Sequence, residues 1–228
     1  MTQLAYFYFD GVTKYASISL AAAFGPDFTA WRFYNDDGTE ATATAAAAQD
    51  TAVTRDINVA AELDLHMRSR IEEQNAAAGE TTDDWKLQYN LNGAGWNDIT
   101  AASAVLRADT ASELTDGAAT TNRSSEPISD PTGSFVAGVQ EEGDGAFLNH
   151  QLTASNFTEH VNALRIQTGD VSLDDFIDLR WVLTTSGGGT LTNTSVPRIN
   201  IADGGVVAAS RARSIARFVF SRQFGRVN

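Results

Sequence analysis

The sequence predicts an all-β protein: an antiparallel, jelly-roll-like β-sandwich with long loops and a basic C-terminal arm. Many short segments alternate apolar and polar residues with a period of two, and turn-forming residues separate them. The 228 residues, 43% of them hydrophobic, suffice for a single all-β domain with a sizeable core. We expect an N-terminal extension at 1–28, a sandwich domain at 29–204 and a basic arm at 205–228.

The clearest strand signal lies in the stretch WKLQYNLNGAGWNDIT, residues 85–100. Trp85, Leu87 and Tyr89 fall on one side of a period-two strand, with polar residues between them. The residues NGAG at 92–95 tolerate the positive φ that a hairpin turn requires. We therefore expect residues 96–100 to return as the partner strand.

A second alternating segment covers residues 63–71. Its apolar residues share one face of a strand, and its polar face carries Asp64, His66, Arg68 and Arg70. Further strands are predicted at 29–35, 103–108, 134–142, 163–168, 176–185 and 198–202. We expect 163–168 and 176–185 to pair with each other across the short acidic link between them.

The predicted core joins the inward residues of these strands. Its expected members are Leu65, Met67, Trp85, Leu87, Tyr89, Ile166 and Trp181. Three stretches rich in Ala, Thr, Ser and Gly, at 36–56, 110–133 and 185–196, are predicted to be long loops.

Charge is unevenly distributed along the chain. Residues 1–204 carry 29 acidic and 11 basic residues, a net −18, whereas residues 205–228 carry five arginines and no acid, a net +5. An acidic body repels nucleic-acid phosphates, so DNA and RNA are not expected partners. There is no cysteine, which suits assembly in a reducing cytoplasm, and no apolar run long enough to indicate a membrane span or a secretory signal.

Catalytic motifs are not evident. The chain has no G-x-S-x-G elbow and no phosphate-binding loop, so we expect neither an enzyme nor a cofactor. Acidic turns at 35–40, 141–145 and 170–175 concentrate oxygen ligands of the kind that Ca²⁺ prefers. None has the spacing of a calcium loop, so solvated turns are the simpler interpretation and no metal site is predicted.

The histidines and tryptophans offer weaker signals. His66, His150 and His160 lack metal-ligand spacing, and His66 is expected at the surface of its strand. A platform for stacking sugars could be built from Trp31, Trp85, Trp96 or Trp181. Trp96 is the best candidate, because it opens its strand beside a turn, whereas core packing is expected for Trp85 and Trp181.

An ordered series of segments resembles a known module. These segments are WRFYNDDGTEATATAAAAQDT, RSRIEEQN, WKLQYNLNGAGWNDITAASAVLRA, LTDGAATTNR, SFVAGVQEEGDG and TEHVNALRIQTGDVSLDDFIDLRWVL, which lie within residues 30–184. Together they resemble a β-sandwich module of structural proteins of tailed phages and environmental viral sequences. The NDDG turn, the KLQY strand and the LRI…LRW pair are the most specific pieces.

The resemblance implies a non-enzymatic structural protein of a tailed-phage or phage-like virion. Such a protein would decorate the capsid or project from the tail, and would be incorporated into the virion after synthesis in the host cytoplasm. It would form a homo-oligomer and contact other virion proteins, either capsid or tail subunits. The alternative is a carbohydrate-binding or host-adhesion module at a fibre or tail tip, with a surface glycan as its ligand.

The C-terminal arm is the expected docking segment. Arginines and aromatics together resemble the anchors of protein interfaces, and the predicted contact residues are Arg211, Arg213, Ile215, Arg217, Phe218, Phe220, Arg222 and Phe224. In the alternative interpretation the same apolar residues add a last helix or strand to the chain's own core.

Overall fold

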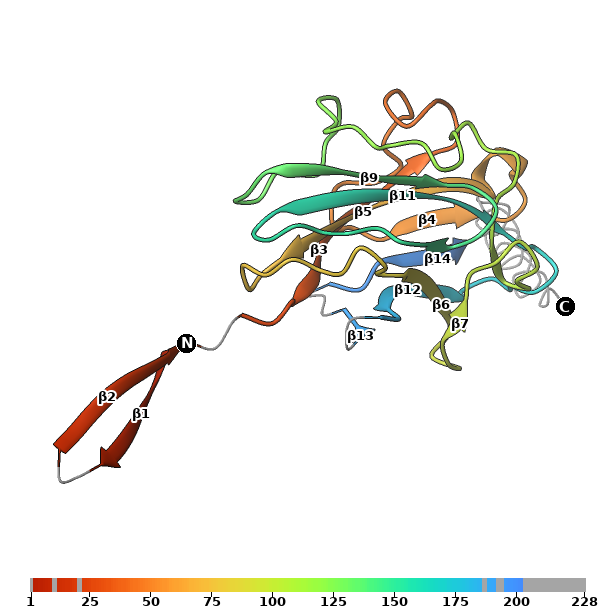
Figure 1. The fold of residues 1–228 in the computed structure, drawn as a ribbon. Helices are drawn as coiled ribbons and strands as arrows, with labels where there is room; N and C mark the ends of the chain where they lie inside the picture. Colours follow the sequence, from red (N-terminus) through yellow and green to blue (C-terminus); the bar gives the residue numbers. More distant parts are fainter. Residues whose placement is uncertain (1, 10–11, 20–21, 186–187, 192–194, 203–228) are drawn as a thin grey trace, which may run out of the picture.

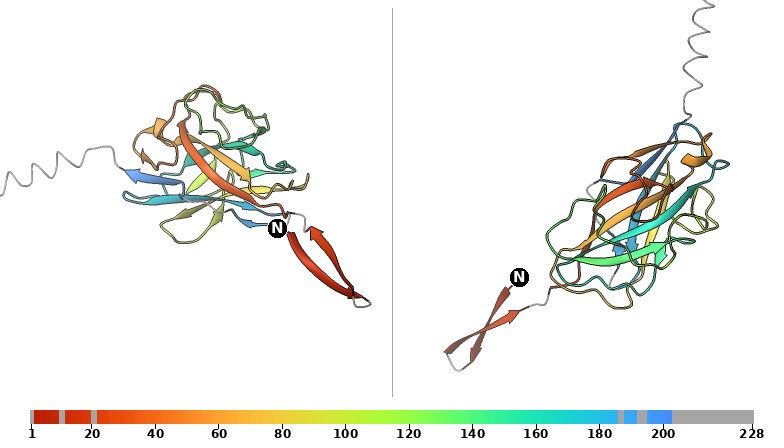
Figure 2. Two further views of the ribbon diagram at one scale, coloured as in Figure 1. Left: turned by 90° about the vertical axis from the view of Figure 1, so that its left-hand side faces the viewer. Right: turned by 90° about the horizontal axis from the view of Figure 1, so that it is seen from above.

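The computed structural model describes residues 2–9, 12–19, 22–185, 188–191 and 195–202. Within these ranges the chain is built of β-strands, with a single turn of 3₁₀ helix at Ala60–Glu62. The predicted all-β sandwich is confirmed, and Figures 1 and 2 show two facing sheets with long loops above one of them. None of the helical segments in these ranges is long and apolar enough to span a membrane.

The first layer is a seven-stranded sheet. Its five central strands follow the order β10, β6, β12, β14, β4, with bounds Ala146–Phe147, Trp85–Leu91, Phe176–Leu183, Arg198–Ala202 and Val53–Asp56. Two short strands extend it, β13 (Gly189–Thr190) beside β12 and β7 (Asn97–Asp98) beside β6. The β6–β7 pair is the predicted hairpin, with Asn92 and Gly93 at positive φ in its turn.

The second layer is a five-stranded sheet. It follows the order β3, β5, β11, β8, with bounds Pro26–Asn35, Asp64–Glu73, Phe157–Ile166 and Leu106–Ala108. Strand β9 (Phe135–Glu141) also pairs with β11, further along the same edge. The β9–β11 and β4–β14 pairs are parallel, and the other pairs in the two layers are antiparallel.

One predicted pairing is wrong. The segments 163–168 and 176–185 do not pair with each other. The first belongs to β11, which pairs with β5, and the second to β12, which pairs with β6 and β14. Their link therefore crosses from one sheet to the other. A short turn-rich link is compatible with both arrangements, because it constrains the distance between strands but not the sheet that each one joins.

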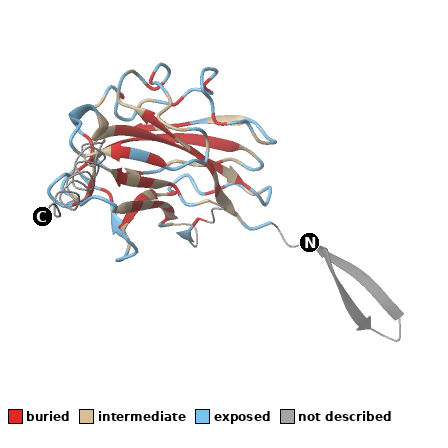
Figure 3. Cartoon of the chain, turned by 180° about the vertical axis from the view of Figure 1, so that it is seen from behind, coloured by how far each residue is buried: buried red, intermediate tan, exposed pale blue. Residues whose placement is uncertain are grey.

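The core between the two sheets confirms the predicted membership. All seven expected residues lie there, each at most 6% exposed, and Trp31 and Phe147 join them. Figure 3 shows the buried residues running along the central strands of both layers. The apolar side of the strand at 85–91 therefore packs into this core.

The polar face of β5 is buried, which corrects the prediction that His66 lies at the surface. His66 and Arg68 are each 1% exposed, and Arg70 is 8% exposed. Arg68 donates hydrogen bonds to the carboxylates of Glu40 and Glu159 and to the carbonyl of Thr121. A period-two pattern separates the two faces of a strand, but it does not reveal that loops fold back over the polar one.

Those covering loops are the stretches predicted at 36–56 and 110–133. Arg123 joins them, because its guanidinium donates to the carbonyls of Glu40 and Ala43 and lies 4.3 Å from the centre of the Tyr34 ring. The first stretch also contains β4, which the sequence did not reveal, just as the third predicted loop contains β13.

The N-terminal residues form a sheet of their own. Strands β1 (Thr2–Phe9) and β2 (Val12–Ser19) pair antiparallel, and neither joins a strand of the two larger sheets within the described ranges. All three views in Figures 1 and 2 place this hairpin, drawn in red, away from the sandwich. The predicted arm at 205–228 lies outside the described residues.

Candidate functional site

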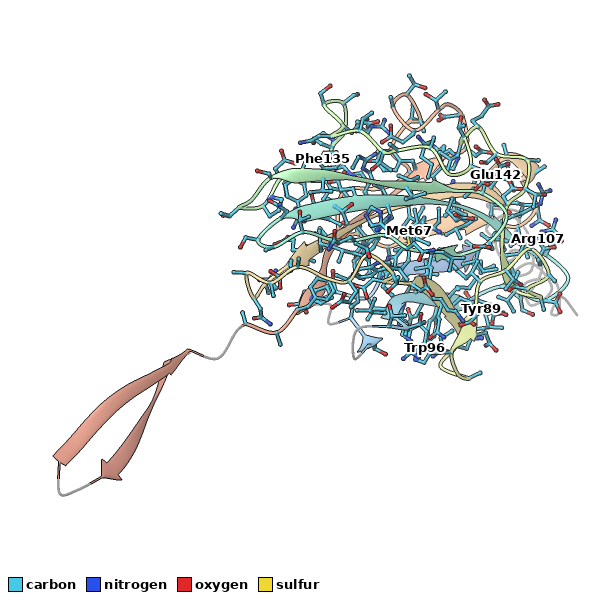
Figure 4. The ribbon with its side chains drawn as sticks, in the orientation of Figure 1. Met67, Tyr89, Trp96, Arg107, Phe135 and Glu142 are labelled. Atoms are coloured by element: carbon cyan, nitrogen blue, oxygen red, sulfur yellow. The ribbon has the colours of Figure 1, made fainter. Side chains whose placement is uncertain are left out.

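An acidic cavity of about 290 Å³ lies where the edges of the two sheets meet. Strand β9 and strand β10 line it, together with loop residues before and after them. The lining residues are Asp116, Gly117, Val139, Glu141, Asp144, Ala146, Phe147 and Leu148. In Figure 4 the Glu142 label marks the end of β9 that borders this cavity, and the Phe135 label marks the other end.

A glycine lets β9 approach β11 closely enough to build the wall. A Cβ at Gly138 would lie 2.1 Å from the carbonyl oxygen of Glu159, so any other residue would displace the strand. The register between the two strands shifts at this point, and the backbone N–H of Val139 donates to Nδ1 of His160 at 3.2 Å. Val139 and Glu141 are two positions apart on the strand, so they face the same side, and both line the cavity.

The three carboxyl groups of the cavity repel one another. Burial, and after it the nearby charges of Asp144 and Asp116, raise the pKa of Glu141 to about 8. In the part of the chain that the structure describes, no ion pair reaches any of the three. The cavity therefore has an uncompensated acidic character, and Glu141 holds a proton near neutral pH.

The floor of the cavity is apolar. Phe147 is 2% exposed, and its ring stacks on the imidazole of His160 and on Trp181, with centroids 4.3 and 5.3 Å away. At the rim, Leu148 is 67% exposed. Carboxylates above an aromatic and aliphatic floor are suited to a ligand with both a cationic and an apolar part.

A second acidic cluster lies under the covering loops. Asp36, Asp64 and Asp109 place carboxylate oxygens within 4.8 Å of one another, which would allow them to share a cation. Protein donors already engage them: Nε2 of His66 lies 2.7 Å from Asp36, and Arg165 lies 3.1 Å from Asp64. Burial raises the pKa of Asp64, although Arg165 opposes the shift.

This cluster corrects the expectation of a surface histidine. The ring of His66 is buried and bonded to Asp36, which belongs to the first predicted acidic turn. The turn at 170–175 has a structural role, because the Asp175 carboxylate accepts hydrogen bonds from Asn92 and from the backbone of Ser172. The turn at 141–145 contributes Asp144 to the cavity, together with the neighbouring end of β9.

The tryptophans divide as the sequence predicts. Trp31, Trp85 and Trp181 are at most 1% exposed, whereas Trp96 is partly exposed beside β7 (Figure 4). The guanidinium of Arg180 lies 4.3 Å from the centre of the Trp96 ring. On the same outer face, Arg180 donates to Gln88 at 2.8 Å, and Gln88 donates to Asp98 at 2.7 Å.

The sequence did not reveal the cavity. The predicted contact residues of the arm, Arg211 to Phe224, lie outside the described ranges and are not placed. The acidic turn 141–145 was a usable signal, but Asp116 comes from a distant loop and Phe147 from a two-residue strand. Comparison with protein-family models, with curated proteins and with solved structures found no match. The fold and the cavity define this chain as a β-sandwich protein with an acidic edge site.

Proposed function

We propose that this chain is a non-enzymatic structural protein of a tailed-phage or phage-like virion. In this proposal it decorates the capsid or projects from the tail, with the sandwich as a rigid body and the terminal segments as its contacts. The observation that carries the proposal is the N-terminal hairpin, whose two strands form a sheet separate from both layers of the sandwich.

A hairpin of this kind needs a partner. Two isolated strands are marginally stable in water, and a third strand or a packing surface is needed to hold them. The segment 2–19 is rich in aromatic residues, with Tyr6, Phe7, Tyr8, Phe9 and Tyr15. Such residues dominate the energetics of protein interfaces. In this proposal a neighbouring subunit supplies the third strand or the packing surface.

The sandwich is suited to the role of a rigid body. Its longest loops are tied down by buried guanidinium groups, as Arg68 and Arg123 bridge the loops to the five-stranded sheet and to each other. Loops held by buried charge pairs resist rearrangement, because breaking such a pair leaves an uncompensated charge in the interior. A decoration or tail protein requires this property, and the resemblance of residues 30–184 to phage structural modules agrees with it.

Deletion of residues 1–21 tests the proposal. We expect the full chain to form a defined oligomer in light scattering. The deletion variant should stay folded by circular dichroism, but it should have a lower molar mass in light scattering and should not be incorporated into purified particles. The number of copies per particle would then separate a capsid coat from a tail component. A full chain that is monomeric and absent from particles would exclude the proposal.

A second candidate function is glycan binding, and the outer face at Trp96 favours it. There, the Trp96 ring lies beside the hydrogen-bonding groups of Gln88, Asp98 and Arg180, which already hold one another in place. Aromatic rings with adjacent polar groups are suited to stacking and hydrogen bonding with a sugar. Binding on a glycan array that Trp96→Ala abolishes, without loss of thermal stability, would support this function over a purely structural one.

A further inference from the structure

We propose that the acidic cavity at β9 and β10 is the docking site for the basic C-terminal arm of a second copy of this chain. The inference rests on the proposed structural function, since it identifies one of the contacts through which copies assemble. Residues 205–228 are the occupant, and Asp116, Glu141 and Asp144 are the groups that receive its arginines.

Charge complementarity is the first argument. The three carboxyl groups of the cavity have no cationic partner among the described residues, and Glu141 is disfavoured as an anion by its own surroundings. The arm carries five arginines and no acid, on a chain whose remaining residues have a net charge of −18. A guanidinium in the cavity would stabilise the ionised form of Glu141 and form the paired hydrogen bonds that carboxylates accept from arginine.

The apolar lining is the second argument. In the segment RFVFSRQF, residues 217–224, each arginine has a phenylalanine one or two positions away. The cavity likewise places its carboxyl groups next to Phe147 and the exposed Leu148. Its volume of about 290 Å³ is at the lower end of the ~300–1,000 Å³ typical of ligand pockets, so it suits one or two anchoring side chains.

The reach of the arm is the third argument, because it is long enough to meet a second copy. Strand β14 ends at Ala202, so the arm at 205–228 begins almost directly after the last strand of the sandwich. Extended chain spans at most ~3.3–3.6 Å per residue, so an arm of this length can cover roughly 80 Å. A domain of this size has a radius of gyration of about 16 Å, so the arm can extend beyond its own sandwich.

Disulfide trapping tests which surface the arm meets. The natural chain has no cysteine, so there is no background of native disulfides. Full chains carrying Leu148→Cys would be mixed with size-tagged full chains carrying Phe220→Cys under mild oxidation. We expect a mixed dimer on a non-reducing gel, formed about tenfold or more faster than with the control below, because docking raises the effective concentration of the two thiols.

The matched control places the first cysteine elsewhere. Val196 is also exposed, at 50%, but it lies in the loop that precedes β14 and does not line the cavity. Equal trapping by Val196→Cys would overturn the proposal, because it would indicate random collision. A chain carrying both Leu148→Cys and Phe220→Cys that closes only an internal disulfide would also overturn it, because the arm would then occupy its own cavity.

Charge removal provides an independent measurement. In the full chain, Asp116→Asn, Glu141→Gln and Asp144→Asn together should weaken self-association by about tenfold or more, the factor expected when one charge-assisted hydrogen bond is lost. The control variant removes the same number of carboxyl groups at exposed sites outside the cavity, with Glu80→Gln, Glu113→Gln and Asp170→Asn. If the two variants weaken self-association equally, the overall charge of the chain and not the cavity controls association, and the proposal is overturned.

Failure of the proposed docking site and failure of the proposed structural function give different results. If the wild-type chain assembles and enters particles while the cavity variant does so equally well, the docking site is wrong and the structural function stands. If the wild-type chain remains monomeric and is absent from particles, the structural function itself fails. In the first case the hairpin deletion still reports on assembly, because it leaves the described lining residues of the cavity unchanged.

Discussion

The ring of Phe147 stacks on the imidazole of His160, with centroids 4.3 Å apart and planes inclined by 20°. This contact joins the floor of the acidic cavity to the centre of the sandwich, because His160 is fully buried and its Nδ1 accepts the N–H of Val139. With Nδ1 occupied as an acceptor, the neutral ring carries its proton on Nε2. The neutral His160 ring therefore contacts both the core and two residues that line the cavity, Phe147 and Val139.

Acidification should destabilise the fold through the histidines. Burial lowers the pKa of His160 well below its usual value, with His150 as a second cause, and burial also lowers the pKa values of His150 and His66. Below about pH 6.5 the unfolded chain binds protons that the folded chain does not, so stability falls as pH decreases, by at most about 1.4 kcal/mol per pH unit for each histidine, between its folded and its unfolded pKa.

Urea denaturation between pH 7.5 and 5.5 would measure this dependence. The slope of stability against pH should be smaller in His160→Asn, whatever the absolute stability of that variant, because asparagine does not titrate. Equal slopes in the wild type and in His160→Asn would contradict the neutral, buried state of His160, because Glu141, whose contribution has the opposite sign, is present in both proteins.

The contribution of Glu141 to stability should depend on pH in the opposite direction. Its folded pKa of about 8 lies above the usual 4.5, so the folded state retains a proton that the unfolded chain has released. This contribution is fully present below the unfolded pKa and is lost as the pH rises through the folded pKa. Glu141→Gln should therefore melt at a higher temperature than the wild type near pH 9, with little difference near pH 4.5. Equal melting temperatures at pH 9 would indicate an ordinary, solvated carboxylate.

Removing Arg68 should be costly. Its guanidinium lies between the buried carboxylates of Glu40 and Glu159, so Arg68→Met would leave two buried acids without their cation. Loss of one partner of a buried pair typically costs about 3–5 kcal/mol. Lys86→Met is the control, since Lys86 pairs with Asp98 on the surface, where a pair is worth about 0–1 kcal/mol. Similar losses in both variants would show that burial does not set the contribution of Arg68.

The β9–β11 contact should not tolerate a side chain at Gly138. Gly138→Ala would place a Cβ against the backbone carbonyl of Glu159, which cannot move without opening the sheet. Gly169→Ala is the matched control, because no atom lies within 4 Å of a Cβ built there. We expect thermal unfolding to shift strongly downward only for Gly138→Ala. A normal melting temperature for Gly138→Ala would show that β9 can move away from β11 at little cost.

Truncation of the core tryptophan should be severe. Trp181 is fully buried against Phe147, and replacing a large buried aromatic by alanine typically costs about 3–5 kcal/mol. Trp96→Ala, at the partly exposed tryptophan, should cost much less. Chemical denaturation of both variants would measure the difference. A minor loss in Trp181→Ala would place that residue outside the packed core.

The sequence by itself determined most of the longer strands of the sandwich and most of the core. Trp85, Leu87 and Tyr89 alternate with polar residues, and this period of two is a local property of extended backbone that can be read without knowing the neighbours. For the same reason the turn at 92–95 predicted its hairpin, and the segment 198–202 predicted β14 with the observed bounds. The acidic body and the basic arm are likewise properties of the chain alone.

Only the tertiary structure decided which surfaces meet. The polar face of β5 became interior because loops distant in sequence supply Glu40 and Thr121 to Arg68. The cavity exists because Asp116, Glu141 and Phe147 come from a loop and from two strands in different sheets. Alternation constrains which side of a strand a residue faces, whereas the partner on that side is set by long-range packing, which no local pattern encodes.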